Sequence, residues 1–554
     1  MPPVGPYYSD DCSNDADEID ILAMKISAQM PGYRRICVDI EGHPNYRCAG
    51  MKTKSDGRND MKKKMILNTA TSLLAQLVAV IYGFVLPRLI LEQFGSEVNG
   101  LTQSIKQFLG IINFLDLGVG QVMRSALYRP LEERNVEKIS SVLASGGKFY
   151  RRLAMMLAGY VAILVCVYPY LVDGDFGWVF TATLIAAMAI SSFAQYYFGI
   201  INEQLIHADQ RGYVIFTLQI VCNVLNALVC VWLMKAGGSI HAVKLVTSLI
   251  FLIRPLVIYL YIQRKYRIDR KIKYSGEPIS QKWNGIAQHI SAVVLDGTDT
   301  IVLTLFSTLS NVSVYSVYYL VIASLQQLYQ SATAGVQSAA GALWAKQDRQ
   351  AQEKMFAATE MGLHFVTVFL FSCVGLLIVP FVRVYTNGLT DTNYIQPLFA
   401  GLLALAYGIR CLRTPYNIWI LAAGHYKQTQ RCHVTAAALN LIISVIAVLR
   451  WGLVGVAVGT LIAMVYQTTW MAIYNTKHLL KRPLWSVIKQ FGVDILTAGT
   501  ICLLAAPITL GQVSYLGWFV MAVKVGLIAL TVTVLAAVIF CRKTVMQLLK
   551  RRGR

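Results

Sequence analysis

Long apolar stretches are the feature that most restricts how this chain can fold. From Ile66 onward, about fourteen stretches contain the roughly 20 mostly apolar residues that a helix needs to cross a membrane. Their limits are 66–91, 100–123, 149–172, 177–205, 213–234, 239–262, 284–306, 312–340, 360–383, 394–422, 433–450, 453–475, 490–510 and 517–541. Hydrophobic residues make up 56% of the chain and charged residues 14%, which is too apolar for water-facing domains. The sequence therefore predicts an all-α polytopic membrane protein.

The second and eighth stretches are the least apolar. Both carry Gln, Ser, Asn and Gly over much of their surface. Polar side chains are costly against lipid, so we expect these two helices to face protein or a water-filled cavity.

The distribution of Lys and Arg predicts the orientation. Basic residues cluster at 61–64, in the segment 263–283 and in the tail after 541, and the predicted outer loops hold few. Basic loops stay in the cytoplasm, so we expect both termini there, in a multi-pass protein of the inner membrane. Most of the net charge of +21 is then a matter of topology, and no nucleic-acid-binding motif accompanies it.

The first sixty residues differ from all the rest. They are polar, carry several acidic residues, and contain no apolar core of a signal peptide. We interpret 1–60 as a disordered or non-native extension upstream of a natural start at Met61. A regulatory tail is the alternative interpretation.

A weak internal repeat predicts the domain organisation. Phe94–Leu101 and Phe306–Val317 each follow one apolar helix, turn briefly, and enter a polar helix. Transporters are often built from such repeats, with the substrate site between them. The predicted parts after the extension are an N-lobe of six spans (61–262), a basic cytoplasmic linker (263–283), a C-lobe of six spans (284–475), and two last spans with a basic tail (476–554).

Three segments resemble a known family. Leu86–Leu101 with Phe108–Gly120 is similar to the start of bacterial oligosaccharide flippases of the Wzx type. Asp296–Tyr319 and Pro415–Lys427 resemble segments of the second lobe in sequences of the same family. The family belongs to the multidrug/oligosaccharidyl-lipid/polysaccharide exporter superfamily, which includes multidrug/toxin exporters and the lipid II flippase. The resemblance implies a MATE-like fold and transfer of an undecaprenyl-diphosphate-linked oligosaccharide between leaflets for surface polysaccharide (O-antigen or capsule) biosynthesis.

Cations inside the spans are the candidates for holding such a diphosphate, because an ionised residue at mid-membrane costs about 2.5–3.5 kcal/mol and needs a reason. The guanidinium group suits phosphate because it donates two parallel hydrogen bonds. The candidates are Arg88, Lys106, Arg254, Arg410 and Arg413. Arg88 could equally extend to the headgroups, and the pair Arg410 and Arg413 could instead bind a neighbouring helix. We expect Lys244 to be interfacial and Lys524 to pack peripherally.

Polar and acidic groups complete the predicted site. Tyr318, Gln326 and Gln330 lie on the polar face of the eighth span, where they suit sugar rings and hydroxyls, or ordinary contacts between helices. Asp296, Asp299 and Asp116 are candidates for binding a coupling H⁺ or Na⁺, or for neutralising arginines. The sequence contains no CxxC pair and no Walker A motif, so we expect no cofactor, no metal and no direct use of ATP.

Two other functions compete with the flippase. An exporter of organic cations with the same fold would favour an acidic cavity, and the excess of Lys and Arg inside the spans argues against it. A membrane enzyme such as a polymerase would need a sizeable outer loop or a catalytic constellation, and we find neither, so we expect no enzyme. The expected partners are a lipid-linked oligosaccharide, membrane lipids and other polysaccharide-assembly proteins, and no nucleic acid.

Overall fold

The computed structural model describes residues 54–112, 119–172, 176–266, 268–269, 272 and 286–540. Asp116, most of the predicted linker, the tail from 541 and the extension up to residue 53 lie outside these ranges. Chain contacts separate Met1–Asp60 from one compact unit, Met61–Arg554. All described elements are helices.

The first lobe begins with a long helix that holds two predicted spans. This helix, α2, kinks at Gly95, whose φ of 81° is a conformation that glycine adopts without strain. The lobe consists of α2 (Lys54–Gly110), α4 (Val119–Glu132), α5 (Val136–Leu171), α6 (Trp178–Ala194), the π-helix η1 (Gln195–Gly199), α7 (Ile200–Ala208), α8 (Gly212–Lys235) and α9 (Ile240–Lys265). The segment α6–η1–α7 is one continuous span with a π-bulge inside it.

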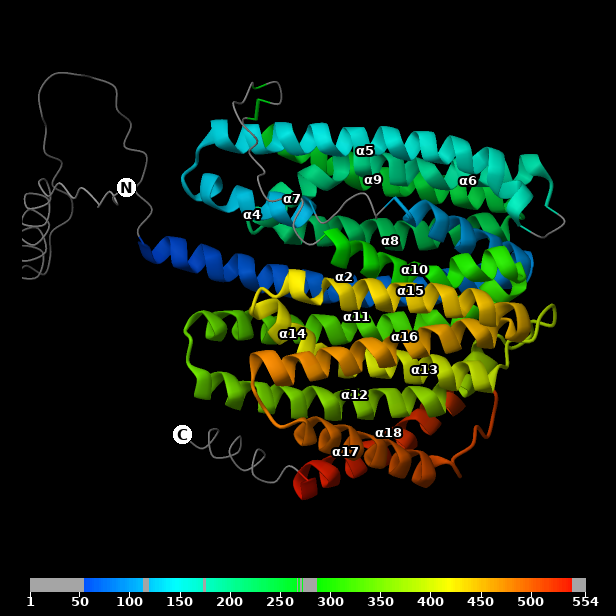
Figure 1. Cartoon of the computed structure of the whole chain (residues 1–554). Coiled ribbons are helices and arrows are strands. Elements are labelled where there is room, and N and C mark those ends of the chain that lie inside the picture. Colours follow the sequence, from blue (N-terminus) through cyan, green and yellow to red (C-terminus); the bar gives the residue numbers. More distant parts are fainter. Residues whose placement is uncertain are drawn as a thin grey trace, which may run out of the picture. The chain divides into compact units, whose positions relative to one another are not determined.

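The second lobe repeats this plan, and two further helices follow it. The lobe consists of α10 (Ile286–Phe306), α11 (Leu309–Ala345), α12 (Arg349–Tyr385), α13 (Pro397–Leu412), α14 (Thr414–Ala422), α15 (Tyr426–Trp451), α16 (Leu453–Tyr474) and the π-helix η2 (Asn475–Leu479). The last pair is α17 (Leu484–Ala505) and α18 (Tyr515–Phe540), which packs on α12. In Figure 1, α5 lies at one edge of the helical array and α17 and α18 lie at the opposite edge.

The predicted fold class is confirmed: the chain is an all-α polytopic membrane protein with two six-helix lobes and two C-terminal helices. Within the described residues, 10 helical segments are long and apolar enough to cross a membrane, judged by length and composition. Large apolar side chains such as Leu228, Trp232 and Leu449 are exposed on the outside, where lipid and not water must solvate them. The polar helices α10 and α11 are not among these segments.

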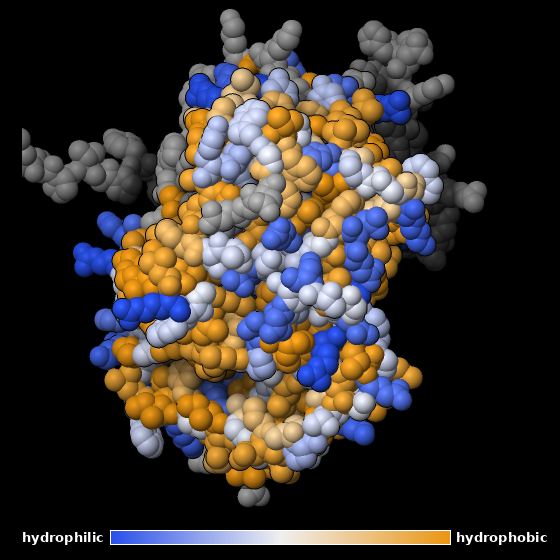
Figure 2. Space-filling view, turned by 90° about the vertical axis from the view of Figure 1, so that its right-hand side faces the viewer, coloured by the Kyte–Doolittle hydropathy of each residue, from blue (hydrophilic) through white to orange (hydrophobic). Residues whose placement is uncertain are grey.

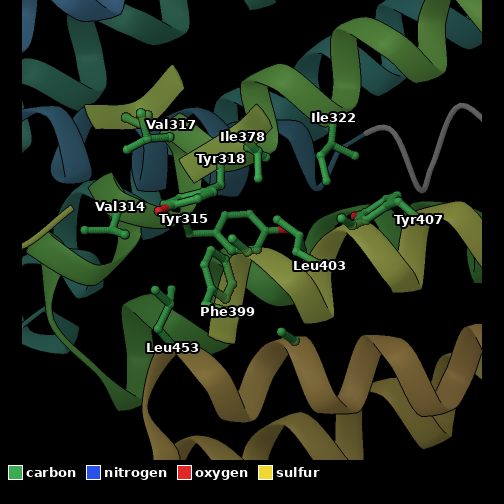
Figure 3. Close-up of a cluster of buried hydrophobic side chains, with 14 of the residues drawn as sticks. Val314, Tyr315, Val317, Tyr318, Ile322, Ile378, Phe399, Leu403, Tyr407 and Leu453 are labelled. Carbon is green, nitrogen blue, oxygen red and sulfur yellow. The ribbon is translucent and has the colours of Figure 1, made fainter. Parts of the chain in front are cut away.

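Each lobe has its own buried core, and the cores meet at one end. Figure 3 shows the second lobe's cluster, in which Tyr315 and Tyr318 of α11 pack against Phe399 of α13. Tyr407 of α13 belongs to the same cluster and contacts Tyr319. Leu91 of the first lobe is part of this cluster, and Leu309 of the second lobe is part of a first-lobe cluster. Each lobe therefore packs an apolar side chain into the core of the other lobe near the kink of α2.

Candidate substrate cavity

A cavity of about 670 Å³ lies between the two lobes. The first lobe lines it from both halves of α2, from α6, η1 and α9, and the second lobe lines it from α10 and α11. The volume falls within the roughly 300–1,000 Å³ of typical ligand pockets. The location agrees with the expectation that a repeat transporter binds its substrate between its repeats.

Two lysines from the first lobe carry the positive charge of this cavity. Lys106 projects from the second half of α2 and is exposed, whereas its neighbours Ile105 and Ser104 are fully buried. Lys244 of α9 lines the same space, close enough for the two ammonium groups to repel each other. Among the described residues neither lysine has an ion-pair partner, so the wall they form is net cationic.

Lys244 lines the cavity, and its interfacial position stays a prediction. Lys244 lies one turn into α9, which begins at Ile240, and its side chain enters the cavity beside Thr247 and Ser248. The sequence showed where Lys244 lies along its span. It did not show which face of the helix points into the first lobe's side of the cavity.

The second lobe contributes a paired charge to the opposite wall. Asp296 of α10 lines the cavity and forms an ion pair with Arg410 of α13, which also lies 5.8 Å from the centre of the Tyr407 ring. The two charges of this pair cancel, so Arg410, unlike the two lysines, adds little net positive charge to the cavity. Arg413, one turn further along, has a buried Nη1 atom without a hydrogen-bond partner and does not line the cavity.

The other predicted cations lie elsewhere. Arg88 is bound to Glu92 at 2.7 Å and donates to the Asn387 carbonyl at 2.7 Å, which places it where the two lobes meet. Arg254 is bound to Glu203 at 2.9 Å inside the first lobe. Neither is among the residues that line the cavity.

The predicted polar residues of α11 are also outside the cavity wall. The Tyr318 hydroxyl donates to the Tyr394 carbonyl at 2.8 Å and accepts from the Gln396 amide at 3.1 Å, deep in the core. Gln326 is buried and Gln330 is exposed, and neither lines the cavity. The helix instead presents a neighbouring face, whose lining residues are Tyr315, Ser316, Val317, Tyr319, Leu320 and Ala323.

Polar groups that the sequence did not single out fill much of the wall. Gln103 and Gln107 stand one turn apart around Lys106, and Tyr82, Tyr196, Ser192 and Thr300 lie around them. The general polarity of the second span indicated this surface, but the composition of one helix could not identify its partners on α6, α9 and α10.

Asp299 lies one turn beyond Asp296 and is only 1% exposed. Its carboxylate accepts hydrogen bonds from the Tyr315 hydroxyl at 2.9 Å and the Thr460 hydroxyl at 2.8 Å. Thr460 in turn accepts from the Asn440 amide at 3.0 Å, and the carbonyl oxygen of that amide is buried without a partner. The result is a buried cluster rich in oxygen atoms and, among its described contacts, without a cationic side chain.

Hydrogen bonds close the lobes against each other where α2 kinks, and we call this region the closed end. The Asp391 carboxylate accepts from the Ser96 amide at 2.6 Å and the Ser96 hydroxyl at 2.9 Å. The Tyr394 hydroxyl joins Ser96 at 2.5 Å to Ser313 at 3.0 Å, and Asn99 donates to Ser313 at 2.8 Å. In Figure 2, which faces this end, hydrophilic residues gather across the middle.

Comparison with known proteins supports the fold and leaves the family open. No protein-family model matches the sequence, and no curated protein matches it. The lipid II flippase MurJ in an inward closed conformation superimposes with a TM-score of 0.65 at 15% identity, covering 87% of this chain and 100% of MurJ. An inward-facing MATE multidrug resistance transporter of the MOP superfamily gives 0.56 at 15% identity, over 74% of this chain and 98% of the transporter.

A third solved structure shows that pocket charge varies on this fold. It is a MOP superfamily transporter from Pyrococcus furiosus, for which reverse polarity of the binding pocket suggests a different function. It superimposes with a TM-score of 0.50 at 13% identity, over 76% of this chain and 96% of that protein. The chain thus has the fold of MurJ and the MATE transporters, and its own cavity residues must indicate the substrate.

Proposed function

We propose that this protein is a flippase that carries an undecaprenyl-diphosphate-linked oligosaccharide across the bacterial inner membrane for surface polysaccharide biosynthesis. The single observation that carries the proposal is the cavity between the lobes, in which Lys106 and Lys244 face the same space without acidic partners among the described residues. Likeness in fold to a lipid II flippase supports it.

The charge of the cavity favours an anionic substrate. Two ammonium groups that line the same cavity raise each other's energy by repulsion, and an anion between them relieves that repulsion. A diphosphate supplies such an anion. We therefore assign the diphosphate to the first-lobe wall, whereas the predictions from sequence had divided this role among Lys106 and arginines of both lobes.

The remaining lining suits sugar. Gln103, Gln107 and Thr300 offer amide and hydroxyl groups, and Tyr196 and Tyr319 offer aromatic faces. Sugar hydroxyls need hydrogen-bond partners when they leave water, since an unpaired buried polar group costs roughly 1–3 kcal/mol. A cavity that holds both cations and neutral polar groups fits a substrate with a charged and an uncharged part.

Transport by alternating access requires that the lobes separate at one end and close at the other. The closed end is held by Ser96, Asp391, Tyr394, Ser313 and Asn99, which come from both lobes. The pattern of basic loops predicts that this end faces away from the cytoplasm. The arrangement is then the one in which a substrate made in the cytoplasm would enter.

We assign the coupling ion to Asp299. A buried carboxylate surrounded by hydroxyl and amide oxygens offers hard ligands, which Na⁺ prefers, or a site for one proton. Asp296 is the weaker candidate because Arg410 already neutralises it. Consumption of the product by later steps remains the alternative source of direction.

The competing function is export of organic cations by the same fold. Likeness to MATE multidrug transporters favours it. A cationic substrate would have to approach the two lysines, and the carboxylate of Asp296 on the opposite wall is engaged by Arg410. The lining charges therefore favour the flippase.

The proposal is tested by replacing both lysines. We expect Lys106→Gln with Lys244→Gln to lower glycan export at least about tenfold, because losing a charged hydrogen bond costs roughly 1.5–3 kcal/mol. Export is measured as surface polysaccharide in cells that depend on this protein, together with its amount in the membrane.

Lys524→Gln is the matched control, because Lys524 is an exposed lysine within α18, away from the cavity. Unchanged export in the double variant would exclude the lysines from the site. Loss of organic-cation efflux, with unchanged glycan export, in cells that lack this protein would instead support the competing function.

A further inference from the structure

We propose that α12 and α17 share a binding site for one proton, formed by the imidazole of His364 and the carboxylate of Asp494. The His364 Nδ1 atom lies 2.6 Å from Asp494 Oδ2, and the two side chains are only 0% and 4% exposed. Neither residue lines the cavity between the lobes or contacts Asp299, so the inference stands apart from the proposed transport.

The site lies where the last two helices are attached to the second lobe. His364 belongs to α12, and Asp494 stands near the middle of α17, which is long and apolar enough to cross a membrane. Both α17 and α18 pack on α12, beside which they lie in Figure 1. Ionisable side chains inside a span are costly and rare, so a buried pair at this junction needs a reason.

Asp494 is a buried carboxylate whose described contacts include no permanently charged group. Its Oδ1 atom accepts a hydrogen bond from the Gln490 amide at 3.1 Å, and its Oδ2 atom faces His364. By contrast, the carboxylate of Glu203 in the first lobe is bound to Arg254 at 2.9 Å. Only the imidazole of His364 is placed to supply the positive charge that Asp494 lacks.

A second carboxylate lies beside the pair and is already neutralised. Glu360 stands one turn before His364 on α12, binds Arg482 at 2.8 Å and accepts from the Tyr416 hydroxyl at 3.0 Å. The Arg482 guanidinium also lies 5.0 Å from the centre of the Phe356 ring. Arg482 is therefore committed to Glu360 and does not compensate Asp494.

The other elements packed against the pair add no charge to it. All further charged side chains of α12, α17, α18 and η2 are exposed, and α11, α14 and α16 carry none. Arg410 of α13 is bound to Asp296. The hydroxyl of Tyr329 on α11 is hydrogen-bonded to Thr367 and to the Cys411 carbonyl.

The free nitrogen of His364 is the place for the proton. An ionised carboxylate only accepts hydrogen bonds, so Nδ1 carries a hydrogen toward Asp494. The Nε2 atom is buried and, in the described part of the chain, has no hydrogen-bond partner. A proton from water that bonds to Nε2 converts the imidazole to imidazolium and takes the net charge of His364, Asp494, Glu360 and Arg482 from one negative charge to none.

The surrounding rings fit an imidazolium. The His364 ring lies 5.8 Å from the centre of the Tyr416 ring and 5.5 Å from that of Phe491. Aromatic rings attract a cation within about 6 Å of their centres. The carboxylate on one side and the two rings on the others therefore all favour the form of His364 that holds the proton.

The proposal is tested on the full-length protein in lipid bilayers, with ¹⁵N-labelled histidine and nuclear magnetic resonance. The nitrogen signals distinguish neutral imidazole from imidazolium, and those of His364 are the ones that disappear in His364→Gln. We expect imidazolium at His364 at about pH 5, the acidic end of the range in which histidines change charge. We expect neutral imidazole at the same pH in Asp494→Asn, because the amide keeps an acceptor for Nδ1 but removes the negative charge.

The control is Glu353→Gln, which removes a carboxylate from the same helix at an exposed position bound to Arg349. The proposal requires imidazolium at His364 in this control, and neutral imidazole there would show a general charge effect and overturn it. Imidazolium that persists in Asp494→Asn would show that His364 holds its proton without Asp494, which also overturns it.

The wild-type protein decides the question even if a variant fails to fold. With labelled aspartate carboxyl carbons, the His364 signal is recognised by its contact with Asp494, since the two side chains are 2.6 Å apart. Neutral imidazole in this signal at about pH 5 would by itself overturn the proposal.

Discussion

The charged side chains within the spans differ in what neutralises them. Arg88, Arg254 and Arg410 are each bound to a carboxylate, at Glu92, Glu203 and Asp296. Burying an ion is tolerated when a partner and hydrogen bonds compensate its lost hydration. Lys106 and Lys244 lack such a partner in the described part of the chain, and both face a cavity that could admit an anion. Pairing within the protein and access to the cavity, and not residue type, therefore separate structural cations from binding candidates.

At Asp299 we predict a loss of ion dependence. Asp299→Asn keeps the size of the side chain and one oxygen that can accept from the Tyr315 or Thr460 hydroxyl, but it removes the negative charge. If the carboxylate binds the coupling ion, transport by the variant no longer responds to an imposed Na⁺ or pH gradient. The measurement is glycan transfer in vesicles with and without each gradient.

Asp209→Asn is the control for this experiment, since Asp209 binds Arg211 at 2.6 Å near the end of α7 and away from the cluster. An Asp299→Asn protein that still follows the gradient would make the carboxylate structural.

Among the elements, α2 determines how the lobes meet. Its kink at Gly95 turns the second half of the helix, and Gly100 then packs directly on α11, where an added Cβ would lie 1.9 Å from the Leu309 carbonyl oxygen. No side chain fits at that distance, and flexible neighbours cannot relieve it because the obstacle is backbone. The closed end thus depends on a glycine at this position.

We predict that Gly100→Leu opens this end. Overpacking a tight contact costs about 1–3 kcal/mol, which corresponds to on the order of a tenfold or larger shift in the population of the closed arrangement. The shift is measured as faster thiol labelling of a Ser96→Cys reporter in a background without other cysteines. Gly335→Leu is the control on α11, because an added Cβ there meets nothing within 4 Å. Equal labelling rates in the two variants would contradict the prediction.

At the scale of the whole molecule, the closed end is the contact that the proposed alternating access would have to break. Ser96 of the first lobe and Asp391 of the second are joined by two hydrogen bonds, at 2.6 and 2.9 Å. The apolar exchange of Leu91 and Leu309 lies beside them. If the lobes rock about the cavity, this region must separate once in every cycle.

We therefore predict that a covalent link here stops transport. Ser96→Cys with Asp391→Cys, joined by a short reducible thiol cross-linker in a cysteine-free background, should lose glycan export and regain it on reduction. A control link between His425→Cys and Tyr474→Cys, whose native side chains are 2.9 Å apart within the second lobe, should leave export intact. Full export by the cross-linked Ser96–Asp391 protein would exclude rocking at this end.

The positions of many helices could be predicted from the sequence. Spans were predicted where apolar residues persist for the thickness of a bilayer, and α8, Gly212–Lys235, lies where 213–234 was expected. The lengths of some helices were underestimated. Helix α5 starts at Val136, whereas the predicted span starts at 149, because the first turns of the helix are polar and give no hydropathy signal. The first two spans form one kinked helix, since only the φ angle of Gly95 interrupts it.

The candidate site could be predicted only in outline. Lys106 was expected on a helix that faces a cavity, and it lines one. Tyr318 lies on the same polar helix but points into the core, because a helix with polar residues on several faces does not indicate which face its neighbours cover. Whether any of these residues binds substrate stays a prediction.

The sequence by itself determined that the chain is a bundle of membrane helices arranged as two lobes, because hydrophobic length and internal similarity are local properties of the chain. The tertiary structure decided which charged side chains within the spans form ion pairs and which line the cavity without one. Asp296 and Arg410 are separated by more than a hundred positions and meet only when α10 packs near α13, while Lys106 and Lys244 meet across a space that no helix fills. Ion pairing is a property of distance in three dimensions, and hydropathy along the chain carries no information about it.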